Sequence, residues 1–276
     1  MKKIFKIISV SLFTIFSFYY TNRVVDLSKN EDPIMKEIKS IKDEYEIKPV
    51  NGVIQENTIL VGSSGKRVDV DASYEKMKRL KYYDDSLLEY INIKPLITKD
   101  KNYEKLIIGS NVKKKISIVF QIDDIDIFNQ ILYIVDKHNI PVTLFMDVKL
   151  IENSEYLMKK IKDNKNISLG IYGYDNSFDI VSLNYVKNFL KKFNYNNYCL
   201  YKDDKFLRAC KNYKINTIKP ILVEKEVYKY LSEYKKEGYI YQIKTNKRNI
   251  AELNSSFMYL HQKGYKIVNL DDLLKE

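Results

Sequence analysis

Residues 116–128 have the sequence ISIVFQIDDIDIF, and this stretch decides the fold class. The run at 116–120 is typical of a buried strand, and the apolar positions from Ile127 onward recur at helical spacing. Folds built from parallel strands often place catalytic side chains where a strand ends. Here Gln121 and Ile122 occupy the strand end, and the acids follow at Asp123 and Asp124. The stretch therefore indicates either an active site or the remains of one.

The same order of strand and helix repeats through residues 116–276. Strands are expected at 116–120, 141–146, 167–172, 197–201, 216–222, 239–243 and 266–270, each followed by a helical segment. Such alternation is typical of parallel strands joined by crossover helices. The sequence therefore predicts an α/β fold, a distorted (β/α)7 barrel with ligand sites at the carboxyl ends of its strands.

The first 115 residues are expected to form three shorter segments. Residues 1–20 combine the basic MKKIFK with 14 uncharged residues, the pattern of an export signal, although a membrane span usually needs about 20 apolar residues. Cleavage or retention as an anchor stays open, and an ordinary buried helix is the alternative. We expect a tether at 21–55 and a small accessory unit at 56–115. The protein is predicted to be exported and extracytoplasmic, either membrane-anchored or secreted.

The net charge of +11 comes almost entirely from lysine, because only five residues are arginine. Lysine supplies diffuse charge, whereas arginine gives bidentate recognition of phosphates and bases. No nucleic-acid-binding motif is present, so no nucleic-acid partner is expected. Anionic envelope polymers or anionic lipid are possible partners, because diffuse charge is sufficient to attract them.

The cysteines do not form a zinc motif. Cys199 and Cys210 are 11 residues apart, with no CxxC pair and no Cys/His cluster. In an exported protein they could form a local disulfide, and two buried thiols are the alternative.

Four segments, in this order, resemble the polysaccharide deacetylases, the NodB homology domain of carbohydrate esterase family 4. They are ISIVF at 116–120, KHNIPVTLFMD at 137–147, NISLGIYGYDN at 166–176 and YLHQKGYKIVNLDDLL at 259–274. The resemblance implies a domain at 116–276 and hydrolysis of acetyl groups on sugars. In the family, an Asp and two His hold a divalent metal, a neighbouring Asp is the base, and a late His is the acid.

The family's catalytic positions carry other residues here. The resemblance places Gln121 at the base, Ile122, Tyr172 and Asn176 at the metal ligands, and Lys244 at the acid. The chain has two histidines, His138 and His261, and both lie near the ends of expected helices, away from the strand carboxyl ends. We therefore predict a deacetylase-like pseudoenzyme of the cell envelope, without a cofactor, that binds wall glycan, peptidoglycan or a protein partner.

Two further hypotheses stay open. Carboxylates follow several expected strands, and they could hold a divalent metal in a rearranged but active site, although helix capping explains those at 123–126 more simply. Alternatively, the chain is a membrane-tethered basic interaction module.

Tyrosines at the strand ends could stack on sugars, although 24 tyrosines make such positions common. The predicted binding groove comprises Asp123, Asp124, Asp147, Tyr172, Tyr174, Asp175, Asn176 and Tyr201.

Overall fold

The computed structural model describes residues 2–175 and 180–276. The chain forms two compact units. One comprises the residues up to 48 together with 65–93, and the other comprises 49–64 together with 94–276.

The smaller unit is mostly helical. It contains α1 (Lys2–Glu31), α2 (Pro33–Ile41), α3 (Val70–Leu80), the short 3-10 helix η1 (Asp85–Leu87) and a two-stranded antiparallel sheet of β3 (Gly65–Val68) and β4 (Tyr90–Ile93). Met35 and Ile38 of α2 are buried with Tyr74 and Met77 of α3. The predicted tether at 21–55 is therefore largely folded, because one face of α2 is apolar and packs into this core. Among the described residues, no helix has the length and apolarity needed to cross a membrane.

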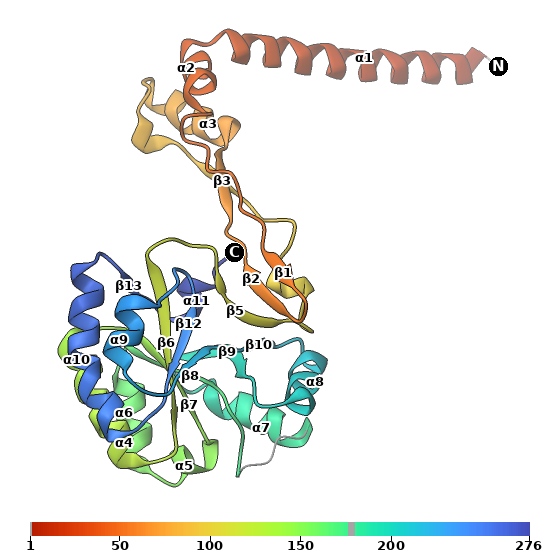
Figure 1. Cartoon of the computed structure of the whole chain (residues 1–276). Helices are drawn as coiled ribbons and strands as arrows, with labels where there is room; N and C mark the ends of the chain where they lie inside the picture. Colours follow the sequence, from red (N-terminus) through yellow and green to blue (C-terminus); the bar gives the residue numbers. More distant parts are fainter. Residues whose placement is uncertain (1, 176–179) are drawn as a thin grey trace. The chain divides into compact units, whose positions relative to one another are not determined.

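The larger unit is built on one curled sheet (Figure 1). The strands follow one another across the sheet in the order β1 (Val53–Gln55), β2 (Thr58–Val61), β5 (Leu106–Ser110), β10 (Asn216–Ile218), β9 (Tyr195–Leu200), β8 (Ile167–Ile171), β7 (Val142–Met146), β6 (Lys115–Ile122), β12 (Ile240–Ile243) and β11 (Ile221–Val223). A short β13 (Lys266–Ile267) also pairs with β6. Within this sheet β1 and β2 are antiparallel, and the described pairs from β2 to β11 are parallel. The predicted α/β fold with a distorted barrel is confirmed.

The sheet curls until β5 meets the segment that leads into β12. The Ser110 N–H donates to the Gly238 carbonyl at 2.8 Å, and Gly109 forms a bridge with Tyr239. A Cβ on Gly109 would lie 2.3 Å from the Gly238 oxygen, so the close approach requires glycine. This contact joins the carboxyl end of β5 to the segment before β12 and brings the half-barrel close to closure.

The sheet also explains why the unit boundaries differ from those expected. Ile59 and Val61 of β2 and Ile107 of β5 are fully buried, in one cluster with Val119 and Phe145. The predicted accessory unit at 56–115 is thus divided, and β2 and β5 belong to the sheet of the predicted 116–276 domain. The apolar side chains of these two strands account for the difference.

Helices surround the outside of the curled sheet (Figure 1). They are α4 (Ile125–His138), α5 (Val148–Glu152), α6 (Glu155–Asp163), α7 (Ile180–Leu190), α8 (Asp204–Asn212), α9 (Val227–Glu233) and α10 (Lys247–Gln262), with α11 (Leu270–Leu273) near the C-terminus. The predicted strand at 216–222 is split into β10 and β11 around Pro220, which has no N–H for a continuous ladder. A disulfide joins buried Cys199 of β9 to buried Cys210 of α8, which decides between the two cysteine hypotheses.

Candidate functional site

The carboxyl ends of five neighbouring strands bring several polar side chains, most of them predicted site residues, to one edge of the sheet, called the mouth here. Asp123 follows β6, Asp147 follows β7, Tyr172 follows β8, Lys202 follows β9 and Lys244 follows β12. A cleft of about 350 Å³ opens at the mouth. Its lining is formed by Asp123, Asp147, Lys149, Leu150, Asn153 and Asp175.

The strand end at 121–122 has no acid and no histidine. Ile122 is fully buried in the main core, and Gln121 donates from Nε2 to the Asp123 carboxylate at 3.1 Å. The Gln121 carbonyl accepts a hydrogen bond from the Thr245 hydroxyl at 3.2 Å. Gln121 therefore orients a neighbouring acid, and it has no basic group with which to remove a proton from water.

Two of the strand-end acids cap helices. Asp124 accepts from the backbone N–H groups of Asp126 and Ile127 at 2.6 and 3.2 Å, so its predicted capping role is confirmed. Asp147 accepts from the N–H groups of Lys149 and Asp175, both at 2.9 Å. These hydrogen bonds fix the turns around the cleft.

Asp175 lies beside Asp147 in the cleft and is paired with a lysine. Its backbone is left-handed, with φ of 50°, and its carboxylate lies 2.8 Å from Lys149 Nζ. In the described part of the chain, no three His, Cys, Asp or Glu side chains lie close enough together to hold a metal ion. Ile122 and Tyr172, which the sequence resemblance assigns to two of the family's ligand positions, are an aliphatic residue and a phenol, so these residues do not fit the family's metal site.

Lys202 and Tyr172 are in contact with each other at the mouth, after the neighbouring strands β9 and β8. Lys202 Nζ lies 3.6 Å from the centroid of the Tyr172 ring, a close cation–π contact. Burial of the ammonium group lowers the pKa of Lys202, and the charges of Asp147 and Asp123 oppose that change. Burial, together with Asp123 and Asp147, raises the pKa of Tyr172 to about 12. Tyr172 is therefore a neutral phenol at neutral pH, in contact with the Lys202 side chain and near Asp123 and Asp147.

Sequence reasoning did not select Lys202. The stretch LYKDDKF at 200–206 showed only that the family's Arg-Pro-Pro-Tyr segment is missing. The available signal was its position directly after the strand expected at 197–201, because residues that follow parallel strands lie at the same edge of the sheet.

The remaining predicted tyrosines lie away from the centre of the mouth. Tyr174 packs edge-on against Tyr185 with ring centroids 5.2 Å apart, and it supports the core. Tyr201 donates to the Asp204 carboxylate at 3.1 Å and lines a different cavity. Asn176 lies outside the described residues.

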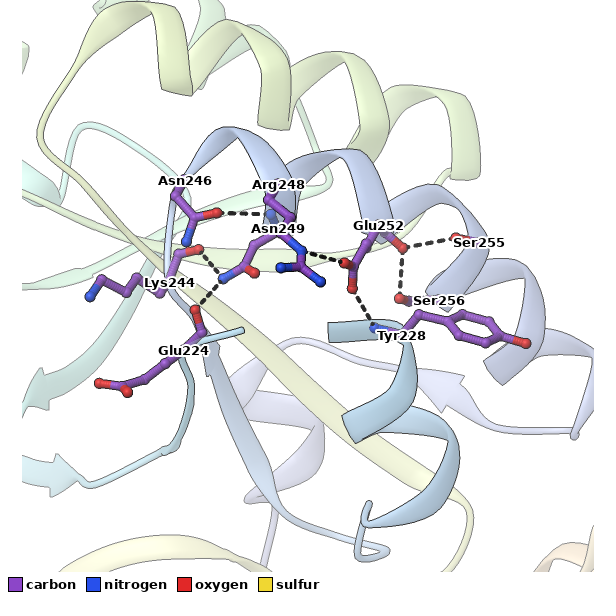
Figure 2. A network of polar contacts seen from close by, with 9 residues as sticks. All are labelled: Glu224, Tyr228, Lys244, Asn246, Arg248, Asn249, Glu252, Ser255 and Ser256. Carbon is purple, nitrogen blue, oxygen red and sulfur yellow. Dashed lines mark hydrogen bonds and ion pairs between the residues drawn. The ribbon is translucent and has the colours of Figure 1, made fainter. Parts of the chain in front are cut away.

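Lys244 is exposed, and a network in the turns after β11 and β12 fixes its backbone (Figure 2). The buried Asn249 donates from Nδ2 to the Lys244 and Glu224 carbonyls, both at 2.9 Å. Glu252 accepts from Arg248 Nε at 3.4 Å and from the Tyr228 N–H at 3.1 Å. The network holds Lys244 at the rim of the mouth through its main chain.

His138 has a structural role, as predicted. Its ring lies 2.9 Å from Asn254 Oδ1 and packs edge-on against Phe257, on α10. It ends α4, away from the strand carboxyl ends.

Comparisons with known proteins identify the fold. No family model matches the chain. A curated relative, the uncharacterized protein YlxY of Bacillus subtilis, is 28% identical to this chain over 155 residues. The match covers 54% of this chain and 48% of that protein, so this chain spans about half the length of the relative.

Three solved structures are similar to this one. A CE4 family pseudoenzyme from Bacillus anthracis has a TM-score of 0.64 at 21% identity, covering 89% of this chain and 96% of that chain. PdaA of Bacillus subtilis, a family 4 carbohydrate esterase, has a TM-score of 0.54 at 18% identity, covering 63% and 86%. A peptidoglycan N-acetylglucosamine deacetylase has a TM-score of 0.50 at 14% identity, covering 61% and 91%.

The chain therefore has the NodB-like fold of the carbohydrate esterase family 4 polysaccharide deacetylases. The resemblance inferred from four sequence segments is confirmed at the level of the fold. Fold alone does not establish activity, which depends on the residues at the mouth.

Proposed function

We propose that this protein is a non-catalytic, deacetylase-like protein of the cell envelope that binds wall glycan at the mouth. One observation carries the proposal. Gln121 and the buried Ile122 end β6, where the sequence resemblance to the deacetylases leads us to expect the base and a metal ligand.

The side chains at the mouth suit a sugar. The apolar C–H face of a sugar ring can pack on a tyrosine ring, and carboxylates and ammonium groups exchange hydrogen bonds with hydroxyl and amide groups. Tyr172, Lys202 and Asp123 supply these three kinds of group. Binding needs no proton transfer, so the loss of the base and acid does not prevent it.

The similar structures support both the wall-glycan ligand and the non-catalytic role in this proposal. One neighbour is described as a peptidoglycan N-acetylglucosamine deacetylase and another as a pseudoenzyme. A mutant of that pseudoenzyme is described as having restored enzymatic activity. The uncharged stretch after MKKIFK supports export, and the net charge of +11 supports a secondary, salt-sensitive attraction to anionic envelope polymers or lipid.

Binding of the full chain to insoluble peptidoglycan and to N-acetylated chitotetraose tests the proposal. We expect Tyr172→Ala and Lys202→Met each to weaken binding about tenfold, because each removes a central contact of about 1.4 kcal/mol. Tyr133→Ala, at a 67% exposed residue of α4, is the matched control and should bind as the native chain does. Equal binding by all four proteins would overturn the proposal.

A further inference from the structure

A second, larger cavity lies in the same unit as the mouth and shares no lining residue with the cleft there. Its volume is about 750 Å³. The turn between β1 and β2, strand β5, the residues after β9 and β10, and helix α8 form its walls. The mouth chemistry does not use it.

One wall of this cavity suits a sugar ring. Tyr201 is half-buried, and its hydroxyl donates to Asp204 at 3.1 Å, which fixes the orientation of the ring. Lys219 Nζ lies 5.3 Å from the ring centroid. An oriented tyrosine beside polar side chains offers an apolar surface and hydrogen-bonding groups together.

The charge of the cavity is opposite to that of the protein. Three lining residues are acidic, namely Glu56, Glu104 and Asp204, and Lys219 is the lining cation. Across the described residues, the Glu56 and Glu104 carboxylates form no ion pair, although the chain as a whole has a net charge of +11. Unpaired carboxylates in a concave site favour a cationic ligand.

We propose that this cavity binds a protonated amino sugar, the glucosamine unit that remains after a glycan loses its N-acetyl groups. An acetamido group is neutral, whereas the free amine carries a positive charge that Glu56 and Glu104 can pair. Tyr201 supplies the surface for the ring. The product of a deacetylase is thus the ligand, which places this protein after a deacetylation reaction.

Calorimetric titration of the full chain with a glucosamine tetramer and with its N-acetylated counterpart tests the inference. The native chain should bind the glucosamine tetramer at the cavity, and the double variant Glu56→Gln/Glu104→Gln should weaken that binding about tenfold. Binding of the acetylated tetramer, which depends on Tyr172 and Lys202, should be unchanged in this variant. Raising the pH until the sugar amine loses its proton should abolish the difference between native chain and variant.

A matched control separates a specific site from general charge. Glu155→Gln/Glu233→Gln removes two other exposed carboxylates, on α6 and α9, and should bind the glucosamine tetramer as the native chain does. The inference is overturned if the native chain does not bind this tetramer, or if the two double variants behave alike. If Tyr172→Ala loses binding of the acetylated tetramer alone, the result concerns the mouth and does not contradict the proposed amino-sugar site in the cavity.

Discussion

Two adjacent side chains distinguish this strand end from a catalytic one. Gln121 is a hydrogen-bond donor to Asp123, and Ile122 is part of the core. Both identities are visible in the sequence, and the structure shows that these two residues end β6. The burial of Ile122 also follows the apolar run of β6, whose residues 116–120 are all buried.

At position 122 we predict that an acid is incompatible with the present packing. Ile122→Asp should lower the free energy of unfolding by about 3 kcal/mol or more, because it buries a carboxylate without a partner. Chemical denaturation measures the change. Gln121→Asp, at a partly exposed position, is the matched control and should cost about 1 kcal/mol or less. Equal losses in the two variants would show that Ile122 is not a core residue.

Because several tyrosines have raised pKa values, we predict that the free energy of unfolding falls at alkaline pH. Burial raises the pKa of Tyr195 and Tyr241 to about 12, and burial with Asp271 raises the pKa of Tyr198. A tyrosine in the unfolded chain loses its proton near about pH 10, below the raised pKa values in the folded chain. Between about pH 10 and pH 12, deprotonation therefore stabilises the unfolded state only, and the free energy of unfolding should fall. Urea titrations at several pH values measure this slope.

The variant Tyr198→Phe tests whether Tyr198 contributes to this pH dependence of the free energy of unfolding. It removes one such group, so the fall in stability from about pH 9 to pH 11 should be smaller than in the native chain. Tyr133→Phe, at an exposed tyrosine, should keep the native slope. A Tyr198→Phe slope equal to the native one would contradict the prediction.

At the scale of elements, covalent and polar links hold the turns that shape the mouth. The disulfide ties the end of β9 to α8, next to the segment that carries Lys202. Reduction, or Cys199→Ala/Cys210→Ala, should lower the free energy of unfolding by about 3 kcal/mol, the effect expected for a short closed loop. Denaturation with and without reductant tests this expectation, and a native chain insensitive to reductant would contradict it.

The α10 network in Figure 2 allows a comparison of neighbouring residues. Asn249→Ala should cost about 2 to 4 kcal/mol, since it leaves the Lys244 and Glu224 carbonyls without their buried donor. Arg248→Ala should cost about 0.5 kcal/mol or less, because its side chain is 70% exposed and its ion pair is solvated. Thermal or chemical unfolding of the two variants gives the values. Similar costs would mean that Asn249 does not hold the turns together.

At the scale of the whole molecule, local pattern predicted most of the fold. The alternation from 116 to 276 gave the strands and helices of the half-barrel because each element carries its own apolar periodicity. The membership of β2 and β5 in the same sheet could not be predicted, since parallel pairs such as Thr58 with Leu106 join segments far apart in sequence. Lys202 was missed for a related reason: its contact with Tyr172 depends on two neighbouring strands ending together.

The most direct test of the central claim is acetate release from peptidoglycan and N-acetylated chitotetraose by the full chain, supplied in turn with zinc, cobalt, manganese and magnesium. We predict no release above the protein-free blank with any of these metals, because the sequence resemblance assigns Gln121, Ile122, Tyr172 and Lys244 to the family's catalytic and metal-binding positions. Metal-dependent release that disappears in Asp123→Asn would contradict this account and would assign the chain to the active deacetylases.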